Sequence, residues 1–196
     1  MSQNINVSIC GSSSFGVLLN QNSTKTMTSQ AAITSLNKKT AISTVESEFL
    51  FQVRIPLHPA IDLGQTPNGH RMILMAKDGT FEGPKLGGKV ISGGDWALVR
   101  GDRSGALDVR LNLKTHDGAL LLMTYYGRMI AAEEDFEYAL DFSKPDDPEG
   151  ANRYYFRTNP LFETSDPRYA WLNHIVTIGK GRTGDNGVIY DVFTIK

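Results

Sequence analysis

The chain has 196 residues, with 20 Lys and Arg, 21 Asp and Glu, four His and one Cys. This length suits one domain with a short appendage, and the 40% of hydrophobic residues suffices for a core, which excludes a wholly disordered chain. A net charge of −1 argues against nucleic-acid binding, a single Cys excludes an internal disulfide, and no apolar run approaches the ~18 residues that cross a bilayer. We therefore expect no nucleic-acid partner and no membrane association. Without a sorting signal, the default expectation is a cytoplasmic protein.

The first 45 residues differ in composition from the rest. They contain fifteen Ser or Thr, three Lys and no acidic residue, for a charge of +3. Residues 46–196 hold 17 basic and 21 acidic residues, for a charge of −4. We predict an irregular, Ser/Thr-rich extension over residues 1–45 and one folded domain over residues 46–196. A targeting segment, or translation that starts at Met27, is the alternative for the extension.

Strand-like alternation begins soon after residue 46. Segment 49–57 places its apolar side chains at every second position: Phe49, Phe51, Val53, Ile55 and Leu57. Segment 106–114 alternates aliphatic with polar residues, and Asp117-Gly118 links it to segment 119–128, which predicts a hairpin. Further strands are expected at 70–76, 85–91, 95–100, 153–163, 169–180 and 187–195.

Only segment 131–142 has a helical pattern, long enough for a turn or two. The predicted fold class is therefore all-β. We expect a single antiparallel β-barrel of about 8–10 strands, with at most one short helix and an irregular N-terminal extension.

Several motifs of enzyme chemistry are missing. The chain has no phosphate loop, no dinucleotide-binding glycine fingerprint and no nucleophile elbow. The four histidines lie at least twelve residues apart, without metal-ligand spacing, and His58 and His116 belong to predicted loops or turns. We therefore expect neither a cofactor nor a metal ion.

Polar residues also alternate along the predicted strands, and two arrangements are open. Asp108, Arg110 and Asn112 lie opposite the aliphatic side chains of segment 106–114. If this polar face points into the barrel, it lines a ligand cavity with a few fixed polar groups. If the aliphatic face points inward, the polar face is a solvated outer surface. Periodicity alone favours the second arrangement, because charged strand faces usually meet water.

Some segments resemble the domain-of-unknown-function 3237 family, small proteins found in bacteria and fungi. The matching segments are EFLFQVRIPL, IDLGQTPNGHRMI, GTFEGPKLGGKVISGGDW, LDVRLNLKTHDGALLLMTYYGR and YYFRTNPLFETSDPRYAWLN, with a C-terminal strand pair. The resemblance covers nearly all of residues 48–196. It implies one antiparallel barrel, similar to small ligand-holding barrels, and no settled activity.

The resemblance also implies a set of recurring polar positions. On these positions we predict catalytic roles for Asp108, Glu82, Arg110 and Arg157. We predict ligand-binding roles for Asp95, Trp96, Tyr126, Tyr155, Trp171 and Asn173, and an apolar wall that includes Tyr125. An arginine could hold a carboxylate, phenolate or enolate, while a neighbouring acid, its pKa changed by burial, moves a proton. The structural alternative is that Asp108, Arg110 and Arg157 form an ion-pair network and that the tryptophans belong to the core.

Three functions therefore compete. The first is a cofactor-independent lyase or isomerase acting on a small, apolar, oxygenated or aromatic compound. The second is a non-catalytic barrel that binds such a compound. The third is an interaction module whose outer aliphatic face forms a homo-oligomer. One observation separates the first two functions from the third: whether Asp108, Arg110 and Arg157 line an enclosed cavity of ligand size. Surface exposure of all three would contradict both pocket functions.

Overall fold

The computed structural model of the protein describes residues 44–196. The predicted extension over residues 1–45, with the alternative start at Met27, therefore falls almost entirely outside the described residues. Within residues 44–196, none of the helices is long and apolar enough to cross a membrane.

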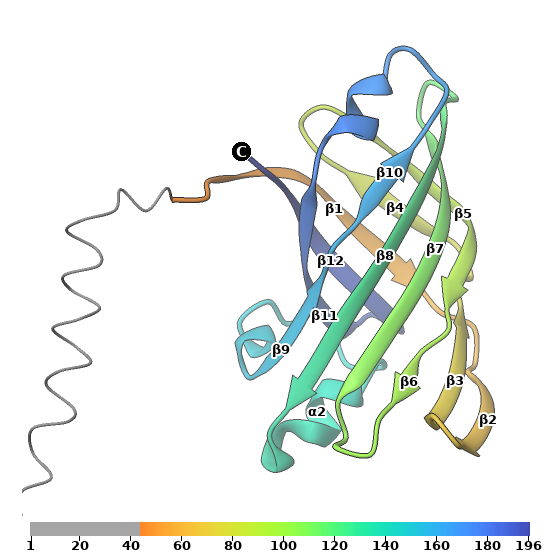
Figure 1. Cartoon of the computed structure of the whole chain (residues 1–196), viewed down its shortest axis with the longest axis vertical. Coiled ribbons are helices and arrows are strands. Elements are labelled where there is room, and N and C mark those ends of the chain that lie inside the picture. The colour runs from red at the N-terminus through yellow and green to blue at the C-terminus, as the bar shows by residue number, and fades with distance from the viewer. Residues whose placement is uncertain (1–43) are drawn as a thin grey trace, which may run out of the picture. The chain divides into compact units, whose positions relative to one another are not determined.

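Twelve strands form one sheet in which every pairing is antiparallel (Figure 1). In chain order they are β1 (Ser47–Pro56), β2 (Ile61–Thr66), β3 (Gly69–Met75), β4 (Gly79–Glu82), β5 (Gly87–Asp95), β6 (Leu98–Val99), β7 (Gly105–Thr115), β8 (Leu120–Ala131), β9 (Tyr154–Thr158), β10 (Leu161–Glu163), β11 (Thr177–Gly184) and β12 (Gly187–Ile195). The short helices are η1 (Glu133–Asp135), α2 (Phe136–Leu140), η2 (Gly150–Asn152) and η3 (Ala170–His174).

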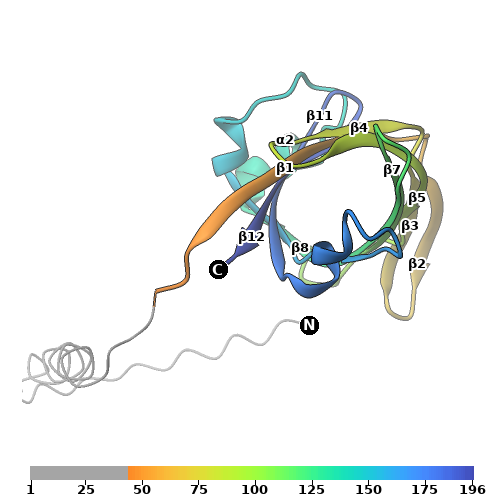
Figure 2. The ribbon, with the colours of Figure 1, turned by 90° about the horizontal axis from the view of Figure 1, so that it is seen from above.

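The sheet closes on itself. Pairing runs in a ring from β1 through β4, β5, β7, β8, β9, β11 and β12 back to β1. Strand β10 also pairs with β8, and β3 with β5, while β6 and β2 extend the sheet beside β3. Seen along its axis, the barrel encloses one interior (Figure 2). The predicted fold class, an all-β closed antiparallel barrel with one short α-helix, is confirmed.

Tight turns set the register of the hairpins. Strands β7 and β8 pair over ten residues across the turn that contains Gly118, whose φ of 91° favours glycine. Strands β11 and β12 are joined by Asp185 and Asn186, both left-handed at φ 53° and 61°. Two consecutive left-handed residues give the turn whose twist matches paired strands. Both turns follow from the Asp-Gly and Asp-Asn-Gly signals in the sequence.

The aliphatic face of each long strand fills the barrel. On β7 the buried side chains are Leu107, Val109, Leu111 and Leu113, and on β8 they are Leu121, Met123 and Tyr125. On β1 an irregularity between Phe49 and Phe51 breaks the expected alternation. Phe51 is buried, whereas Phe49 lies on the outside against Phe193. The prediction of one continuous buried face for segment 49–57 is therefore wrong at Phe49.

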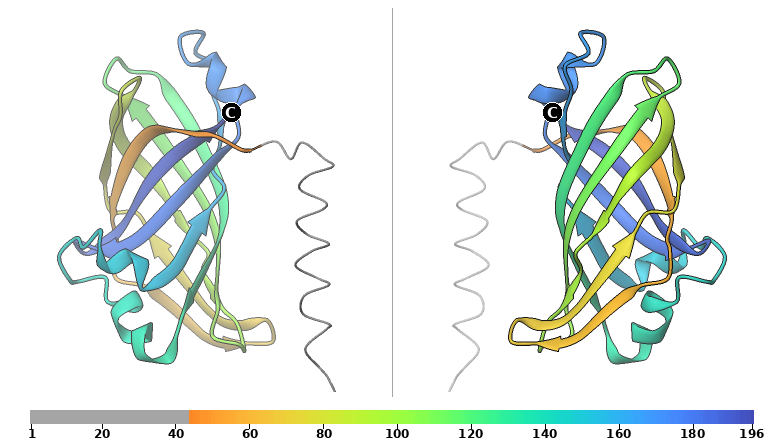
Figure 3. Two further views of the ribbon diagram at one scale, coloured as in Figure 1. Left: turned by 90° about the vertical axis from the view of Figure 1, so that its left-hand side faces the viewer. Right: turned by 90° about the vertical axis from the view of Figure 1, so that its right-hand side faces the viewer.

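Different elements cover the two ends of the barrel (Figures 1 and 3). Helix η3 lies at one end and α2 at the other. The expected helix over segment 131–142 is confirmed as the short pair η1 and α2. The expected strand over segment 169–180 is wrong in its first half, because residues 170–174 form η3 and only residues from Thr177 onward enter the sheet.

Candidate functional site

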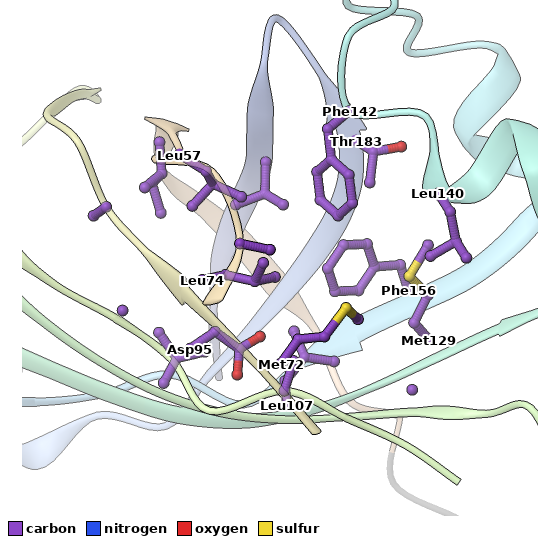
Figure 4. Close-up of a pocket in the computed structure, with 18 of the residues that line it drawn as sticks. Leu57, Met72, Leu74, Asp95, Leu107, Met129, Leu140, Phe142, Phe156 and Thr183 are labelled. Carbon is purple, nitrogen blue, oxygen red and sulfur yellow. The ribbon is translucent and has the colours of Figure 1, made fainter. Parts of the chain in front are cut away.

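The barrel holds a cavity of about 420 Å³ that lies among the inward side chains near α2 (Figure 4). Its walls are mostly aliphatic and aromatic, and the residues that Figure 4 labels on them include Leu57, Met72, Leu74, Leu107, Met129, Leu140, Phe142 and Phe156. The rim is formed by exposed residues of three loops, with His58 between β1 and β2, Ser143 after α2 and Asn186 in the β11–β12 turn. A volume of this size suits a small organic ligand.

Asp95, the last residue of β5, contributes a carboxyl group to the cavity wall. The carboxyl oxygens point into the space beside Met72 and Leu74 (Figure 4). Among residues 44–196, no other Asp or Glu and no Lys or Arg lines this cavity. The site is therefore an apolar chamber with a single acidic group.

A β-bulge turns Asp95 toward the interior. Val90 and Ser92 pair with two successive residues of β7, so that Ile91 is an extra residue in β5. Neighbouring residues of a strand point to opposite faces of the sheet. One extra residue therefore moves each later side chain of the strand to the face opposite the one that regular alternation would give it. Asp95 consequently lies opposite the buried Val109 and shares its inward direction.

The surroundings of Asp95 favour its neutral form. Burial raises the pKa of this carboxyl to about 6, although the backbone N–H of Asp108 donates a hydrogen bond to Oδ1 at 2.9 Å, which acts to lower it. The charges of Asp108 and Arg71 act in opposite directions and are smaller influences. A pKa near neutrality allows the group both to accept and to return a proton under ordinary conditions.

Two buried tyrosines lie beside this acid. Val109 of β7 pairs with Asp95 of β5 on one side and with Tyr125 of β8 on the other. The three side chains therefore form one inward-facing row across these neighbouring strands. Tyr190 of β12 packs against Tyr125 edge to face, with ring centroids 5.4 Å apart. Burial, reinforced by the charge of Asp95, raises the pKa of both phenols, so both hydroxyl groups stay protonated.

A buried ion cluster holds the loop that forms part of the rim. The side chain of Arg182, only 4% exposed, pairs with Asp146 of this loop and with Asp191 of β12. Arg54 of β1 also pairs with Asp146, at 2.8 Å. Hydrogen bonding from Arg182 lowers the pKa of Asp146 and keeps the pair ionised. The cluster thereby fastens the segment that carries Phe142 to three strands of the barrel.

The predicted network of Asp108, Arg110 and Arg157 does not line the cavity. Asp108 and Arg110 pair with each other at 2.8 Å, with side chains 39% and 51% exposed, because they alternate with the buried leucines of β7. Arg157 of β9 also faces outward, where its guanidinium lies 5.2 Å from the ring of Tyr155. The hypothesis that this polar face forms the floor of a cavity is wrong, and the solvated-surface alternative holds. The expectation that exposure of these residues would exclude a pocket is also wrong, because the cavity is lined by the opposite, aliphatic face of the strands.

The cations on this outer face form a row. Arg157 is directly opposite Arg128 of β8 on one side and Lys180 of β11 on the other. Within the described barrel, none of the three forms an ion pair, and the two arginines donate to backbone carbonyl groups instead. Like charges that face each other across strands destabilise a sheet.

The remaining predicted residues also lie outside the cavity. Trp96, Tyr126 and Tyr155 are exposed on the barrel's outer surface. Glu82 forms an exposed pair with His116 at 2.8 Å. Trp171 and Asn173 lie on η3, at the end of the barrel opposite α2. Trp171 packs on the core, and Asn173 hydrogen-bonds the backbone of the preceding loop.

Of the ten predicted site residues, Asp95 alone lines the cavity, together with the expected wall residue Tyr125. Sequence reasoning missed Tyr190, although the inward alternation of Val188, Tyr190 and Val192 marks it. It also missed the aliphatic walls of the cavity, which would be expected if the face of β7 that carries Leu107 and Leu111 pointed inward. Within residues 44–196, no group of three or more His, Cys, Asp or Glu side chains is placed to hold a metal ion.

Comparison with known proteins places this barrel in a family. Residues 45–195 match the family described as "Protein of unknown function (DUF3237)". A UPF0311 protein of Clostridium acetobutylicum is 33% identical over 150 residues, which cover 75% of this chain and 92% of that protein. A UPF0311 protein of Rhodopseudomonas palustris strain TIE-1 is 28% identical over 153 residues, which cover 78% and 97%.

Solved structures share the fold. A conserved protein of unknown function from Rhodopseudomonas palustris has a TM-score of 0.71 and 25% identity, over 79% of this chain and 100% of that one. A β-barrel-like protein from Acinetobacter baumannii AYE has a TM-score of 0.67 and 34% identity, over 79% and 98%. An enzyme from Penicillium herquei, at 22% identity and a TM-score of 0.58, covers 79% and 97% and has a similar fold. Since the family match spans the whole described barrel, the chain belongs to the DUF3237 family, also designated UPF0311.

Proposed function

We propose that this protein is a cofactor-independent lyase or isomerase that moves a proton on a small, mostly apolar, oxygenated or aromatic compound held in the barrel cavity. One observation carries the proposal: an acid with a pKa of about 6, Asp95, is the single carboxyl group among the described residues that line an apolar chamber. Carboxyl groups tuned toward neutrality by burial are typical of general acid–base catalysis.

The lining determines which ligands fit. Since the part of the chain that the structure describes brings no Lys or Arg to the cavity walls, no fixed cation there neutralises a carboxylate or phosphate, and ionised Asp95 repels both. Its aliphatic and aromatic walls favour burial of a neutral carbon skeleton. The expected ligand is therefore uncharged and carries few polar groups.

The chemistry follows from Asp95 acting alone as the proton carrier. At pH 7 a group with a pKa near 6 is about nine-tenths ionised, so it can take a proton from an acidic C–H or O–H bond. Returning that proton to another atom of the same molecule completes an isomerisation or a cyclisation. Delivering it to a departing hydroxyl group completes a dehydration.

The likeness to an enzyme from Penicillium herquei supports catalysis only in a general sense, because a barrel of this shape can carry an active site.

Hydrogen–deuterium exchange tests the proposal without knowledge of the product. The protein is incubated in D₂O with a panel of neutral enones, ketones and phenols, and loss of C–H signals is followed by NMR. We expect exchange with at least one class of compound, rising with pH through about 6 as Asp95 ionises. Asp95→Asn should abolish exchange and retain binding, whereas Asp78→Asn, at an exposed carboxyl between β3 and β4, should retain both.

A non-catalytic binding barrel is the second candidate, and the predominance of apolar walls favours it. Tight binding of panel compounds with no exchange and no turnover would establish it in place of the enzyme. The oligomer hypothesis stays a prediction, although the aliphatic faces of β7 and β8, which it placed on the outside, lie inside the barrel.

A further inference from the structure

We propose that Tyr125 is a second catalytic residue, donating a hydrogen bond to a carbonyl oxygen of the ligand while Asp95 moves the proton, so that the substrate is a neutral ketone with an acidic neighbouring C–H bond. This inference rests on the proposed function and names its substrate class. Tyr190 acts through Tyr125 and is a positioning residue.

The geometry places the two groups on one wall of the cavity, with Val109 between them. Asp95 and Tyr125 each lie opposite Val109, so their backbones are separated by two strand spacings, about 10 Å. Both residues line the cavity. A carbonyl group and its adjacent carbon can therefore contact the phenol and the carboxyl group at the same time.

The packing around Tyr190 fixes the direction of Tyr125. Tyr190 is buried between Phe156 and Tyr125, with ring centroids 5.3 Å and 5.4 Å away. Gly181 lies opposite Tyr190 and leaves room for these rings, since a Cβ there would approach both Phe156 and Tyr190 to within 2.9 Å. The rings therefore have little freedom to turn.

The proposed arrangement includes a hydrogen bond that the Tyr190 hydroxyl group donates to the hydroxyl oxygen of Tyr125, whose ring packs edge to face against that of Tyr190. When Tyr125 accepts this bond, its own proton is free to be donated into the cavity. A donor that itself accepts a hydrogen bond is polarised and donates more strongly. Because both phenols resist ionisation, they remain donors across the pH range in which Asp95 titrates.

The proposed step is balanced without a cofactor. Asp95 removes a proton from the carbon next to the carbonyl group, and the electrons of the C–H bond form a C=C bond as the carbonyl oxygen becomes an enolate. Tyr125 stabilises this oxygen by hydrogen bonding. When the substrate also carries a C=C bond in the β,γ position, the enolate is conjugated with it, and Asp95, now neutral, returns the proton to the γ carbon. The C=C bond then lies between the α and β carbons, which gives the isomeric α,β-unsaturated ketone.

Binding of an enolate mimic tests the role of Tyr125 apart from turnover. The probe is 4-nitrophenol, whose phenolate absorbs visible light, and the background is Asp95→Asn, which imitates the protonated acid. We expect the bound probe to be the phenolate. Adding Tyr125→Phe should weaken its binding at least tenfold, as loss of a hydrogen bond to a charged oxygen does.

Two further substitutions separate catalysis from packing. Tyr190→Phe should weaken phenolate binding by about threefold alone and should add nothing once Tyr125→Phe is present, because Tyr190 acts only through Tyr125. Tyr126→Phe is the matched control: it removes a hydroxyl group from the next residue of β8, which faces outward, and should leave binding unchanged. Near-UV circular dichroism checks that each variant keeps its packed core.

The outcomes keep this inference distinct from the proposed function. If Asp95→Asn binds no phenolate, or if Tyr125→Phe affects binding no more than Tyr126→Phe does, Tyr125 is not the donor. In either case, exchange that depends on Asp95 would leave the proposed proton transfer intact. Absence of hydrogen–deuterium exchange with every compound of the panel in the wild-type protein would instead overturn the proposed function.

Discussion

Replacing Asp95 by Asn should stabilise the folded protein at neutral pH and have little effect in acid. Asn keeps the shape of the side chain and an oxygen that can accept the backbone N–H of Asp108. In the folded protein the pKa of Asp95 is about 6, against 3.8 without the barrel around it. At 1.36 kcal/mol for each pKa unit, ionised Asp95 costs the fold up to about 3 kcal/mol.

The pH dependence has a definite sign. Because the folded state holds the proton more tightly than the unfolded chain does, stability due to Asp95 is fully present below pH 3.8. It is lost as the pH rises to about 6 and changes no further above that value. The assay is urea unfolding of the wild type and Asp95→Asn at several pH values from 4 to 8. The difference in unfolding free energy between the two proteins isolates Asp95 from all other titrating groups.

A difference that stays constant with pH would refute this account of Asp95, as would a variant that gains stability only in acid. Asp78→Asn serves as the control for the change of carboxyl to amide, since its side chain is exposed between β3 and β4 and should give a small difference. The opposite sign would mean that Asp95 is stabilised as an anion, which would remove the argument for its proton-transfer role.

The other predictions concern the framework of the barrel and are all measured by urea unfolding. Arg182→Met removes the buried partner of Asp146 and Asp191 and should lower the free energy of unfolding by about 3 kcal/mol. A decrease below about 1 kcal/mol would mean that the ion cluster does not hold the rim loop. Gly88→Ala places a Cβ 2.1 Å from a β7 carbonyl oxygen, whereas the Cβ of Gly101→Ala enters open space. The first substitution should lower the free energy of unfolding several times more than the second. Equal losses of unfolding free energy would contradict the close approach of β5 and β7. Arg157→Glu puts a carboxylate between Arg128 and Lys180 and should add about 0.5 kcal/mol of stability, whereas Arg157→Gln should add less; a loss would show that the cationic row carries no repulsion.

Most of the fold could be predicted because local patterns and global packing agree. The β7–β8 hairpin is visible in its alternation and in the turn at Asp117-Gly118, and the barrel uses both as expected. The errors arise where the period of two breaks. An irregularity moves Phe49 to the outside, and residues 170–174, which alternate like a strand, instead form a helical turn at the end of the barrel.

The site was harder to predict, because alternation shows that a strand has two faces without showing which face is inside. Asp108 and Arg110 looked functional as a polar pair, yet the four aliphatic side chains between and beside them release more free energy by burial and take the interior. Asp95 was predicted as a ligand contact from the family resemblance. Its inward direction could not be read from the strand pattern, since counting in twos from the buried Val90 places it outside.

The extra residue Ile91 therefore gives a criterion for comparing relatives. An acidic residue at the end of this strand is equivalent to Asp95 only if the number of residues between it and the preceding buried position is the same. A homologue that lacks one residue in this stretch would keep the carboxyl group in the alignment and display it to solvent. The spacing, more than the presence of the acid, would then divide barrels that can carry this proton-transfer group from barrels with an entirely apolar interior.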